Sequence, residues 1–257
     1  MNGVVATSGG PASVLELDGI SVQFGGVHAL QKVSMALPEL PGISAIIGPN
    51  GAGKTTLFNV VSGLVKPQSG RVIFRGADVT GLRADQVFAA GLSRTFQGVR
   101  LFANLTLIQN LLISARSMPG SGGKREALDR SAAALDQVGL HRDLWDRYPS
   151  ELSLAQSRFA EVARAIASRP AVLMLDEPGA GLNPAEKIAV SELFREIARN
   201  YCCRIVLVEY DMKLVMAVAE TIWVMNFGTI LTHGSPEMVQ NDPAVIEAYL
   251  GSADDDH

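Results

Sequence analysis

The sequence predicts an α/β fold whose core is a mostly parallel sheet, with an N-terminal antiparallel β subdomain and an inserted α-helical subdomain. Two apolar runs, at 43–47 and 171–175, each lead into a polar loop, as strands buried on both faces of a parallel sheet do. Partial alternation of apolar and polar residues before position 40 indicates a meander of antiparallel strands. The stretch from 98 to about 167 lacks strand-like runs and has helical periodicity, which predicts the insert.

Length and composition limit the class of protein. The chain has 257 residues, 47% of them hydrophobic, and a net charge of −4, and this length suits one large domain or one domain with a smaller lobe. No run of about 18 apolar residues occurs, so no membrane-spanning helix is expected. The absence of a basic block argues against nucleic acid as a partner. Residues 1–13 resemble a flexible leader more than a signal peptide, so we expect a cytoplasmic protein.

The strands and helices follow in order along the chain. Strands are predicted at 14–24, 33–37, 43–47, 71–74, 171–175 and 204–208, with two short ones around 227–228. Helices are predicted at 54–64, 105–116, 125–138, 155–167, 184–200 and 212–219, with two more before residue 251. A Pro-Gly-Ser-Gly-Gly segment at 119–123 interrupts the helical insert. One domain is therefore expected over 14–251, with an acidic, solvated tail at 252–257.

The only two cysteines are adjacent, which excludes the usual metal-binding spacings. Cys202 and Cys203 stand at the start of a β-branched run. Both are therefore predicted to be small buried apolar residues.

The stretch I-I-G-P-N-G-A-G-K-T-T-L-F at 46–58 contains the pattern G-x-x-x-x-G-K-[ST] between a predicted strand and a predicted helix. Its backbone can curl so that N–H groups face inward, while the positive end of the following helix points into the same cavity. Such a loop binds nucleotide phosphates, which makes the core a P-loop NTPase core. An ordinary glycine-rich turn is the alternative, but it does not explain a match at every fixed position. The predicted nucleotide-binding residues here are Gly48, Pro49, Asn50, Gly51, Ala52, Gly53, Lys54, Thr55 and Thr56.

Within this loop three side chains have distinct predicted roles. Lys54 would reach the β- and γ-phosphates, and Thr55 would ligate Mg²⁺. Thr56 would bond a further phosphate oxygen. The loop thus predicts a nucleotide and a magnesium ion as cofactors.

A second strand delivers two carboxylates to the edge of the sheet where ligands bind. The apolar run at 171–175 leads directly into Asp176 and Glu177. Asp176 would take part in the coordination shell of Mg²⁺. Glu177, on the opposite side of the strand, would polarise an attacking water. Acidic pairs at strand ends are otherwise often helix caps, but the phosphate loop in the same chain favours catalysis.

The order of the motifs resembles the ATP-binding subunits of ABC transporters over about residues 14–251. After the phosphate loop come Gln97, Leu-Ser-x-x-Gln at 152–156, Asp-Glu-Pro at 176–178 and Ala-Gly-Leu-Asn at 180–183. Taken singly, Gln97 or Leu-Ser-x-x-Gln would more often be a polar loop or a helix cap. Four further segments look most like the branched-chain amino acid importer group, namely 21–26, 94–102, 209–216 and 249–251.

The resemblance implies roles for residues that the motifs alone do not explain. Phe24 would stack on the adenine of ATP, although a lone Phe after a strand is more often a core residue. Gln97 would sense Mg²⁺ and the attacking water. Such subunits dimerise with two ATP molecules between them, so Ser153 and Gln156 of one chain would face the γ-phosphate held by the other.

Two positions depart from the family pattern. Leu154 and Ala155 stand where the family usually has two glycines, and Ala155 is the less favourable because glycine lets backbone approach phosphate without a Cβ. Tyr210 stands where the family has a histidine that contacts the γ-phosphate. Tyr210 can donate a hydrogen bond but cannot carry positive charge, so slow hydrolysis is expected.

These departures favour a heterodimer over a homodimer. Tyr210 affects the site on its own phosphate loop, whereas Ala155 affects the site on the partner's loop. In a homodimer each site would carry both defects, whereas with an intact, different partner each site would carry only one.

The resemblance implies an ATPase subunit that energises an importer for branched-chain amino acids or a related small solute. Its partners would be a second ABC ATPase subunit, integral membrane permease subunits and, indirectly, a periplasmic or extracellular solute-binding protein. The chain would lie on the inner face of the cell membrane. Two alternatives stay open: a nucleotide-gated dimerising clamp with little hydrolysis, and an ABC ATPase for another cargo, such as lipopolysaccharide export.

Overall fold

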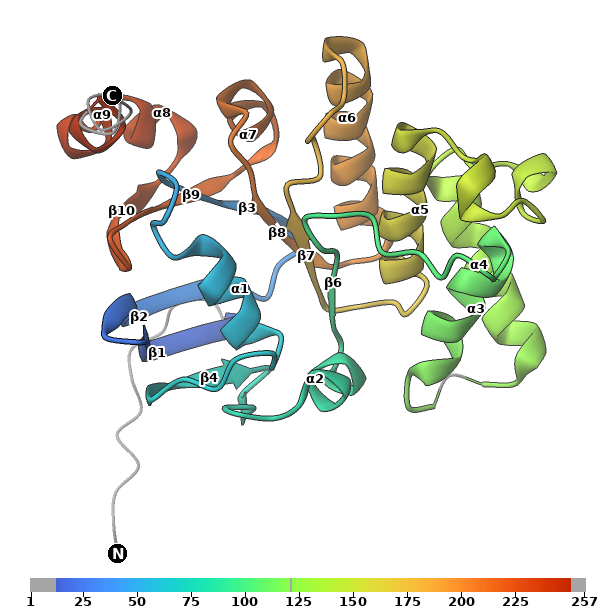
Figure 1. Ribbon diagram of the computed structural model, residues 1–257, viewed down its shortest axis with the longest axis horizontal. Helices are drawn as coiled ribbons and strands as arrows, with labels where there is room; N and C mark the ends of the chain where they lie inside the picture. The colour runs from blue at the N-terminus through green and yellow to red at the C-terminus, as the bar shows by residue number, and fades with distance from the viewer. Residues whose placement is uncertain (1–12, 121, 251–257) are drawn as a thin grey trace, which may run out of the picture.

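A four-stranded antiparallel sheet forms the N-terminal subdomain in this computed structural model, which describes residues 13–120 and 122–250 (Figure 1). The strand order is β2-β1-β4-β5, with β1 at Ser13–Phe24, β2 at Val27–Pro38, β4 at Ser69–Phe74 and β5 at Ala77–Asp78. The predicted second strand, 33–37, was too short. Gly25 and Gly26 both have positive φ and make a two-residue hairpin turn, so that β2 pairs with β1 from Val27 onward.

The core sheet has six strands in the order β10-β9-β3-β8-β7-β6. They are β3 (Gly42–Ile47), β6 (Leu92–Arg94), β7 (Val172–Asp176), β8 (Arg204–Val208), β9 (Thr221–Asn226) and β10 (Thr229–Gly234). All neighbouring strands are parallel except β9 and β10. Every residue of β3, β7 and β8 is buried, as expected for central strands covered on both faces. Strand β6 was not predicted because three residues are too few to show a period.

The predicted helical insert is present, with small shifts at the helix ends. It contains α3 (Leu107–Ser117), α4 (Lys124–Gln137) and α5 (Leu154–Ile166), with 3₁₀ turns at Arg142–Leu144 and Pro149–Glu151. These helices lie together beside the edge of the core sheet that β6 forms (Figure 1). Two of them begin with a capping box, because Thr106 and Ser153 each accept a hydrogen bond from the backbone of the residue three positions on.

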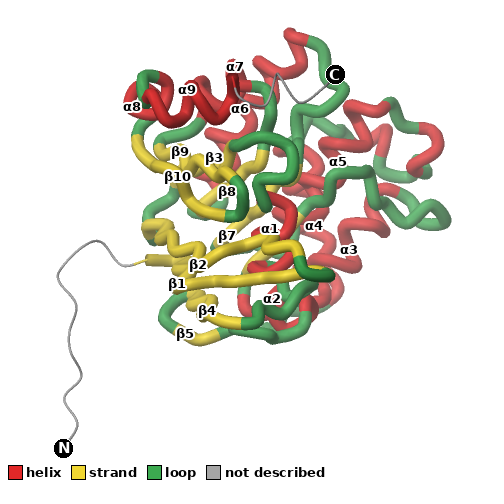
Figure 2. The backbone as a smooth tube through the Cα atoms, turned by 60° about the vertical axis from the view of Figure 1, so that its left-hand side comes forward, coloured by secondary structure: helices red, strands yellow, loops and turns green. Residues whose placement is uncertain are grey.

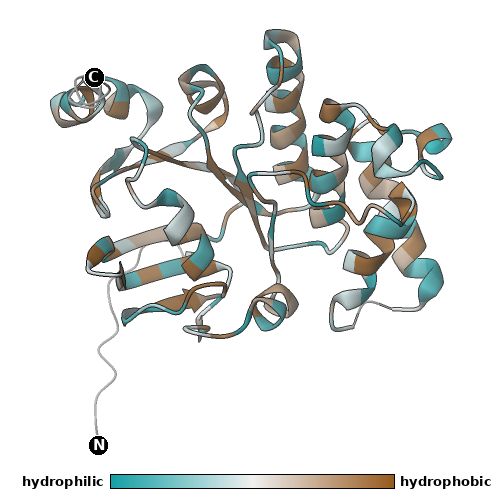
Figure 3. Cartoon of the chain, in the orientation of Figure 1, coloured by the Kyte–Doolittle hydropathy of each residue, from teal (hydrophilic) through white to brown (hydrophobic). Residues whose placement is uncertain are grey.

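Helix α1 (Lys54–Val61) lies between the two sheets, and this arrangement holds the phosphate loop in place (Figure 2). Its side chains Leu57, Phe58, Val60 and Val61 share one core cluster with residues of β1, β2, β7 and β8. The remaining helices are α2 (Ala84–Ala90), α6 (Pro184–Asn200), α7 (Met212–Val218), α8 (Pro236–Gln240) and α9 (Pro243–Leu250). Helices α3 to α7 cover the other face of the core sheet and form a second cluster with it. Figure 3 shows the strands of the core sheet as a largely hydrophobic band.

The prediction for the cysteines is half wrong. Cys203 is buried, and burial raises the pKa of its thiol to about 12. Cys202 is exposed instead, because it lies in the turn between α6 and β8 with a left-handed backbone, φ 49°.

The predicted leader and tail fall almost wholly outside the described residues, and Ser13 belongs to β1 rather than to a leader. Within the described ranges, no helix combines the length and the apolar character needed to cross a bilayer.

Candidate active site

The phosphate loop joins β3 to α1 and depends on close backbone contacts. Gly48 and Gly53 have φ of 151° and 99°. A Cβ on Gly48 would lie 2.1 Å from the carbonyl oxygen of Met225, and a Cβ on Gly53 would lie 2.5 Å from that of Ala29. Only glycine fits either position. The loop is therefore wedged between β2 and the end of β9, with Pro49, Asn50, Gly51 and Ala52 forming its turn.

Helix α1 has an uncapped N-terminus. Gly53 precedes it and supplies no side-chain hydrogen bond, and the first turn contains no acidic residue. Its first N–H groups and the positive end of its dipole are thus available to an anion. Thr55, which is exposed, and Thr56 lie in this first turn.

Lys54 is buried, with 3% of its surface exposed. Its ammonium donates hydrogen bonds to the carbonyl oxygens of Gly48 at 2.6 Å and Pro49 at 2.8 Å. Burial lowers its pKa to about 8, although Glu177 and Asp176 act in the opposite direction. Near pH 8 the loop therefore holds Lys54 partly as the charged ammonium and partly as the neutral amine.

Tyr210 lies over Lys54 of the same chain. The ammonium is 4.5 Å from the centroid of the Tyr210 ring, which is within the range of a cation–π interaction. Burial raises the pKa of Tyr210, and the carboxylates of Glu177 and Asp176 raise it further. Its phenol stays protonated, and Tyr210 contacts Lys54 of the phosphate loop through the face of its ring, which the sequence did not indicate.

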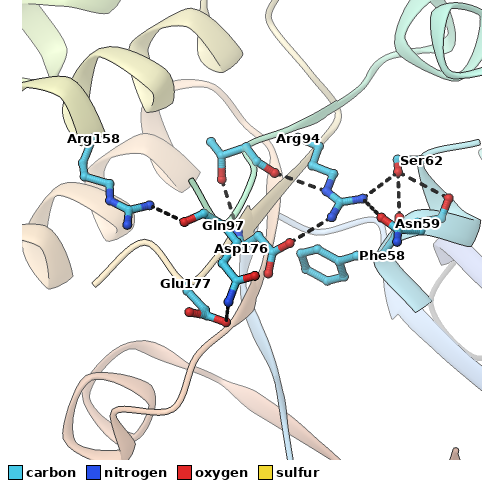
Figure 4. Close-up of polar contacts among 9 residues, drawn as sticks. Phe58, Asn59, Ser62, Arg94, Gln97, Arg158, Asp176 and Glu177 are labelled. Atoms are coloured by element: carbon cyan, nitrogen blue, oxygen red, sulfur yellow. Dashed lines mark hydrogen bonds and ion pairs between the residues drawn. The ribbon is translucent and has the colours of Figure 1, made fainter. Parts of the chain in front are cut away.

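Asp176 forms a buried ion pair that the sequence did not predict. Its Oδ2 accepts a hydrogen bond from Arg94 at 2.8 Å, and the two side chains are only 2% and 6% exposed. Arg94 also donates to Asn59 and Ser62 of the α1 segment (Figure 4). Sequence reasoning noted Arg94 only as part of a motif, because its partner lies 82 residues away.

The other carboxylate oxygen of Asp176 differs in its surroundings. Asp176 Oδ1 is buried and makes no hydrogen bond with the described residues. A buried carboxylate oxygen left in this way is available to accept a hydrogen bond or to bind a cation. A hydrated Mg²⁺ beside bound phosphates fits it, since this ion takes oxygen ligands and keeps several waters.

The side chains of Gln97 and Glu177 lie in contact with each other (Figure 4). The side-chain amide of Gln97 donates to Glu177 Oε1 at 2.8 Å. Arg158 of α5 holds the Gln97 carbonyl oxygen at 3.1 Å. The predicted strand alternation at Glu177 is wrong: β7 ends at Asp176, and Glu177 has a left-handed backbone, φ 50°. Such a conformation is costly for a non-glycine residue and is typical of functional sites.

Three further residues predicted to bind nucleotide, Phe24, Ser153 and Gln156, lie outside the phosphate loop. Phe24 ends β1 and is 51% exposed. Ser153 and Gln156 bond to each other at the start of α5, and within the described residues none of their hydrogen bonds reaches the loop. Leu154 is exposed, and a Cβ on Gly181 would lie 3.1 Å from it. This exposed helix start is free to face another chain.

The family of the chain follows from comparison with known proteins. The model of the family described as ABC transporter matches residues 30–180, more than half of the chain. This chain belongs to the ABC transporter family. Within this family it is an ATP-binding ATPase subunit coupled to transport. A second model, described as branched-chain amino acid ATP-binding cassette transporter, matches residues 229–255.

Individual relatives agree with this ABC transporter assignment. The chain is 42% identical over 253 residues to the high-affinity branched-chain amino acid transport ATP-binding protein LivG of Salmonella typhimurium, covering 93% of this chain and 98% of that protein. It is 37% identical to BraF of Pseudomonas aeruginosa, with the same coverage. The lipopolysaccharide export system ATP-binding protein LptB of Acidithiobacillus ferridurans is 32% identical over 85% of this chain and 88% of that protein. The resemblance to the branched-chain group is confirmed.

The fold of this ABC ATPase has close counterparts among solved structures. The ADP conformation of MJ1267, an ATP-binding cassette of an ABC transporter, superposes with a TM-score of 0.84 at 29% identity, covering 93% of this chain and 99% of that one. The cassette cbiO1 from Clostridium perfringens gives a TM-score of 0.80 at 26% identity, with the same coverage of both chains. The predicted fold class is therefore confirmed.

Proposed function

We propose that this ABC ATPase energises a membrane importer for branched-chain amino acids or a related small solute, from the cytoplasmic side of the cell membrane. The names of LivG and BraF support the solute class. The convergence of Lys54, Asp176 and the Gln97–Glu177 pair at one sheet edge supports hydrolysis as the energy source. Its partners would be permease subunits, a second ATPase subunit and, indirectly, a solute-binding protein.

In this proposal the side chains of the site divide the work of hydrolysis among them. Glu177 takes the proton of the attacking water, and Gln97 orients its carboxylate. Lys54 and the N–H groups at the start of α1 hold the phosphates, and Phe24 stacks on adenine. Mg²⁺, when bound, neutralises charge on the phosphates, and Thr55, Gln97 and Asp176 would hold it. Because the described residues contain no group of three or more His, Cys, Asp or Glu side chains that could hold a metal ion, phosphate oxygens and waters would complete its shell.

Uptake measurements test the import role. Cells that lack this chain should lose accumulation of labelled leucine, isoleucine or valine, and the wild-type gene should restore it. Restoration by a Glu177→Gln variant, or unchanged uptake in the deletion strain, would argue for another role.

A second candidate function is a nucleotide-gated clamp with little turnover. The ring of Tyr210 over Lys54 favours it, since this ring stands where the family has a histidine. In either case Ser153 and Gln156 would act on the nucleotide of a partner chain. The heterodimer proposal follows from the same departures, Tyr210 and Ala155.

We expect Tyr210→His to raise the steady-state rate of ATP hydrolysis on the order of tenfold. A histidine can carry positive charge and donate a hydrogen bond to the γ-phosphate, whereas Tyr210 presents its ring to Lys54. The measurement is phosphate release by the purified chain, with Tyr201→His as a control distant from the site. A wild-type chain with ordinary turnover that Tyr210→His does not increase would contradict both the clamp and the heterodimer proposals.

We expect nucleotide affinity to fall as the pH rises above about 8. The lowered pKa of free Lys54 is about 8, and bound phosphates raise this pKa because they favour the charged form. Above pH 8 binding must therefore take up a proton and weakens, by up to about tenfold per pH unit. Calorimetry in buffers of different ionisation enthalpy measures both affinity and proton uptake. Lys54→Arg should show no such decline, and a flat profile in the wild type would refute this assignment.

A further inference from the structure

Glu209 is a buried carboxylate that the hydrolytic scheme above does not use. It follows β8 and is only 4% exposed. Its Oε1 accepts a hydrogen bond from the backbone N–H of Gly179 at 2.6 Å. Its Oε2 accepts from the N–H groups of Tyr210 at 2.9 Å and Asp211 at 3.3 Å. Both oxygens are thus used on backbone groups of two segments that are about 30 residues apart.

The first of these segments is the loop that carries Glu177. A Cβ on Gly179 would lie 2.6 Å from Glu209 Oε1, so only glycine allows this approach. The Glu177 N–H donates to the carbonyl oxygen of Val208 at 2.9 Å. Two hydrogen bonds therefore attach the left-handed segment around Glu177 to the end of β8. The N–H of Glu177 itself bonds to Val208, and the N–H of Gly179, two residues further on, bonds to Glu209.

The second segment carries Tyr210, whose ring covers Lys54. The same carboxylate that holds Gly179 holds the Tyr210 N–H. Next along the chain, Asp211 caps α7 and pairs with Lys187 of α6 at 2.7 Å. One side chain thus fixes the distance between the loop of Glu177 and the residue over the phosphate-loop lysine.

We propose that Glu209 is a positioning residue for ATP hydrolysis, acting through Gly179 and Tyr210. This inference rests on the proposed role of Glu177. Burial raises the pKa of Glu209, whereas its backbone hydrogen bonds favour the charged form. Through Gly179 these bonds help to hold the loop that contains the costly backbone of Glu177. A displacement of about 1 Å at a catalytic group can lower a rate by about 100-fold.

The test is Glu209→Gln, assayed by single-turnover hydrolysis with the chain in excess over ATP. Glutamine keeps the size of the side chain. Its –NH₂ group, however, would face a backbone N–H group that now donates to a carboxylate oxygen, so at least one hydrogen bond would be lost. We expect the rate constant at saturation to fall about tenfold or more, with the half-saturating concentration within about twofold of wild type. The Cβ of Gly179→Ala would push on the same carboxylate, so this variant should also lose rate at saturation while keeping its half-saturating concentration. It replaces Glu209→Gln as the test if Glu209→Gln does not fold.

The matched control is Arg204→Gln, at the opposite end of β8. Arg204 is 3% exposed and pairs with Glu220, so this variant should lower stability without changing the rate constant. A wild-type rate in Glu209→Gln, or an effect confined to half-saturation, would overturn the inference. Glu177→Gln distinguishes failure of the proposed function from failure of the positioning role. If Glu177→Gln hydrolyses ATP at the wild-type rate, the proposed function fails. If Glu177→Gln is inactive while Glu209→Gln is as active as wild type, only the positioning role fails.

Discussion

Replacing Glu177 by glutamine is expected to lower ATP hydrolysis by at least about 100-fold while leaving nucleotide affinity within about twofold. The amide oxygen of glutamine can still accept the hydrogen bond that Gln97 donates at 2.8 Å. The geometry is thus kept, and the group that takes a proton from water is lost. Phosphate release gives the rate, and calorimetry with ATP gives the affinity.

A surface variant shows whether this loss is specific. Glu192 is exposed on α6, so Glu192→Gln should behave as wild type in both measurements. A Glu177→Gln chain that keeps more than about a tenth of the wild-type rate would exclude Glu177 as the general base. Unchanged hydrolysis with weakened binding would instead indicate a role in holding the nucleotide.

Replacing Arg94 by methionine is expected to reduce the free energy of unfolding by about 3–5 kcal/mol. The change leaves the Asp176 carboxylate without its 2.8 Å partner in a site where only 2% of that side chain is exposed. A buried charge without compensation is far more costly than the lost attraction itself. For a chain of this size the melting temperature should fall by about 6–20 °C, as calorimetry or thermal circular dichroism would measure.

Two comparisons isolate the buried charge as the cause. The Arg94→Met, Asp176→Asn double variant should recover most of the stability, since it removes both charges. Arg71→Met, which breaks the pair of Arg71 with Asp18, should cost less than about 1 kcal/mol, because those side chains are 62% and 54% exposed. Equal losses for Arg94→Met and Arg71→Met would contradict the interpretation.

The phosphate loop was predictable because its determinants are contiguous. Each glycine, Lys54 and the helix that follows lie within one short stretch between a strand and a helix. The acidic pair was predictable for a similar reason, since an apolar run that ends in Asp176 is recognisable as a buried strand reaching a ligand-binding edge. The catalytic and binding roles assigned to these residues stay predictions.

The sequence by itself thus determined the fold class, the helical insert and the residues that bear charge at the site, because local patterns of polarity record local structure. Only the tertiary structure decided which of these residues meet. Arg94 reaches Asp176 across 82 residues, and Glu209 reaches Gly179 across 30. Such contacts arise from the order in which strands join the core sheet, and no periodicity in the chain encodes that order. The exposure of Cys202 was also decided only in the structure, because the left-handed turn before β8 directs this side chain outward.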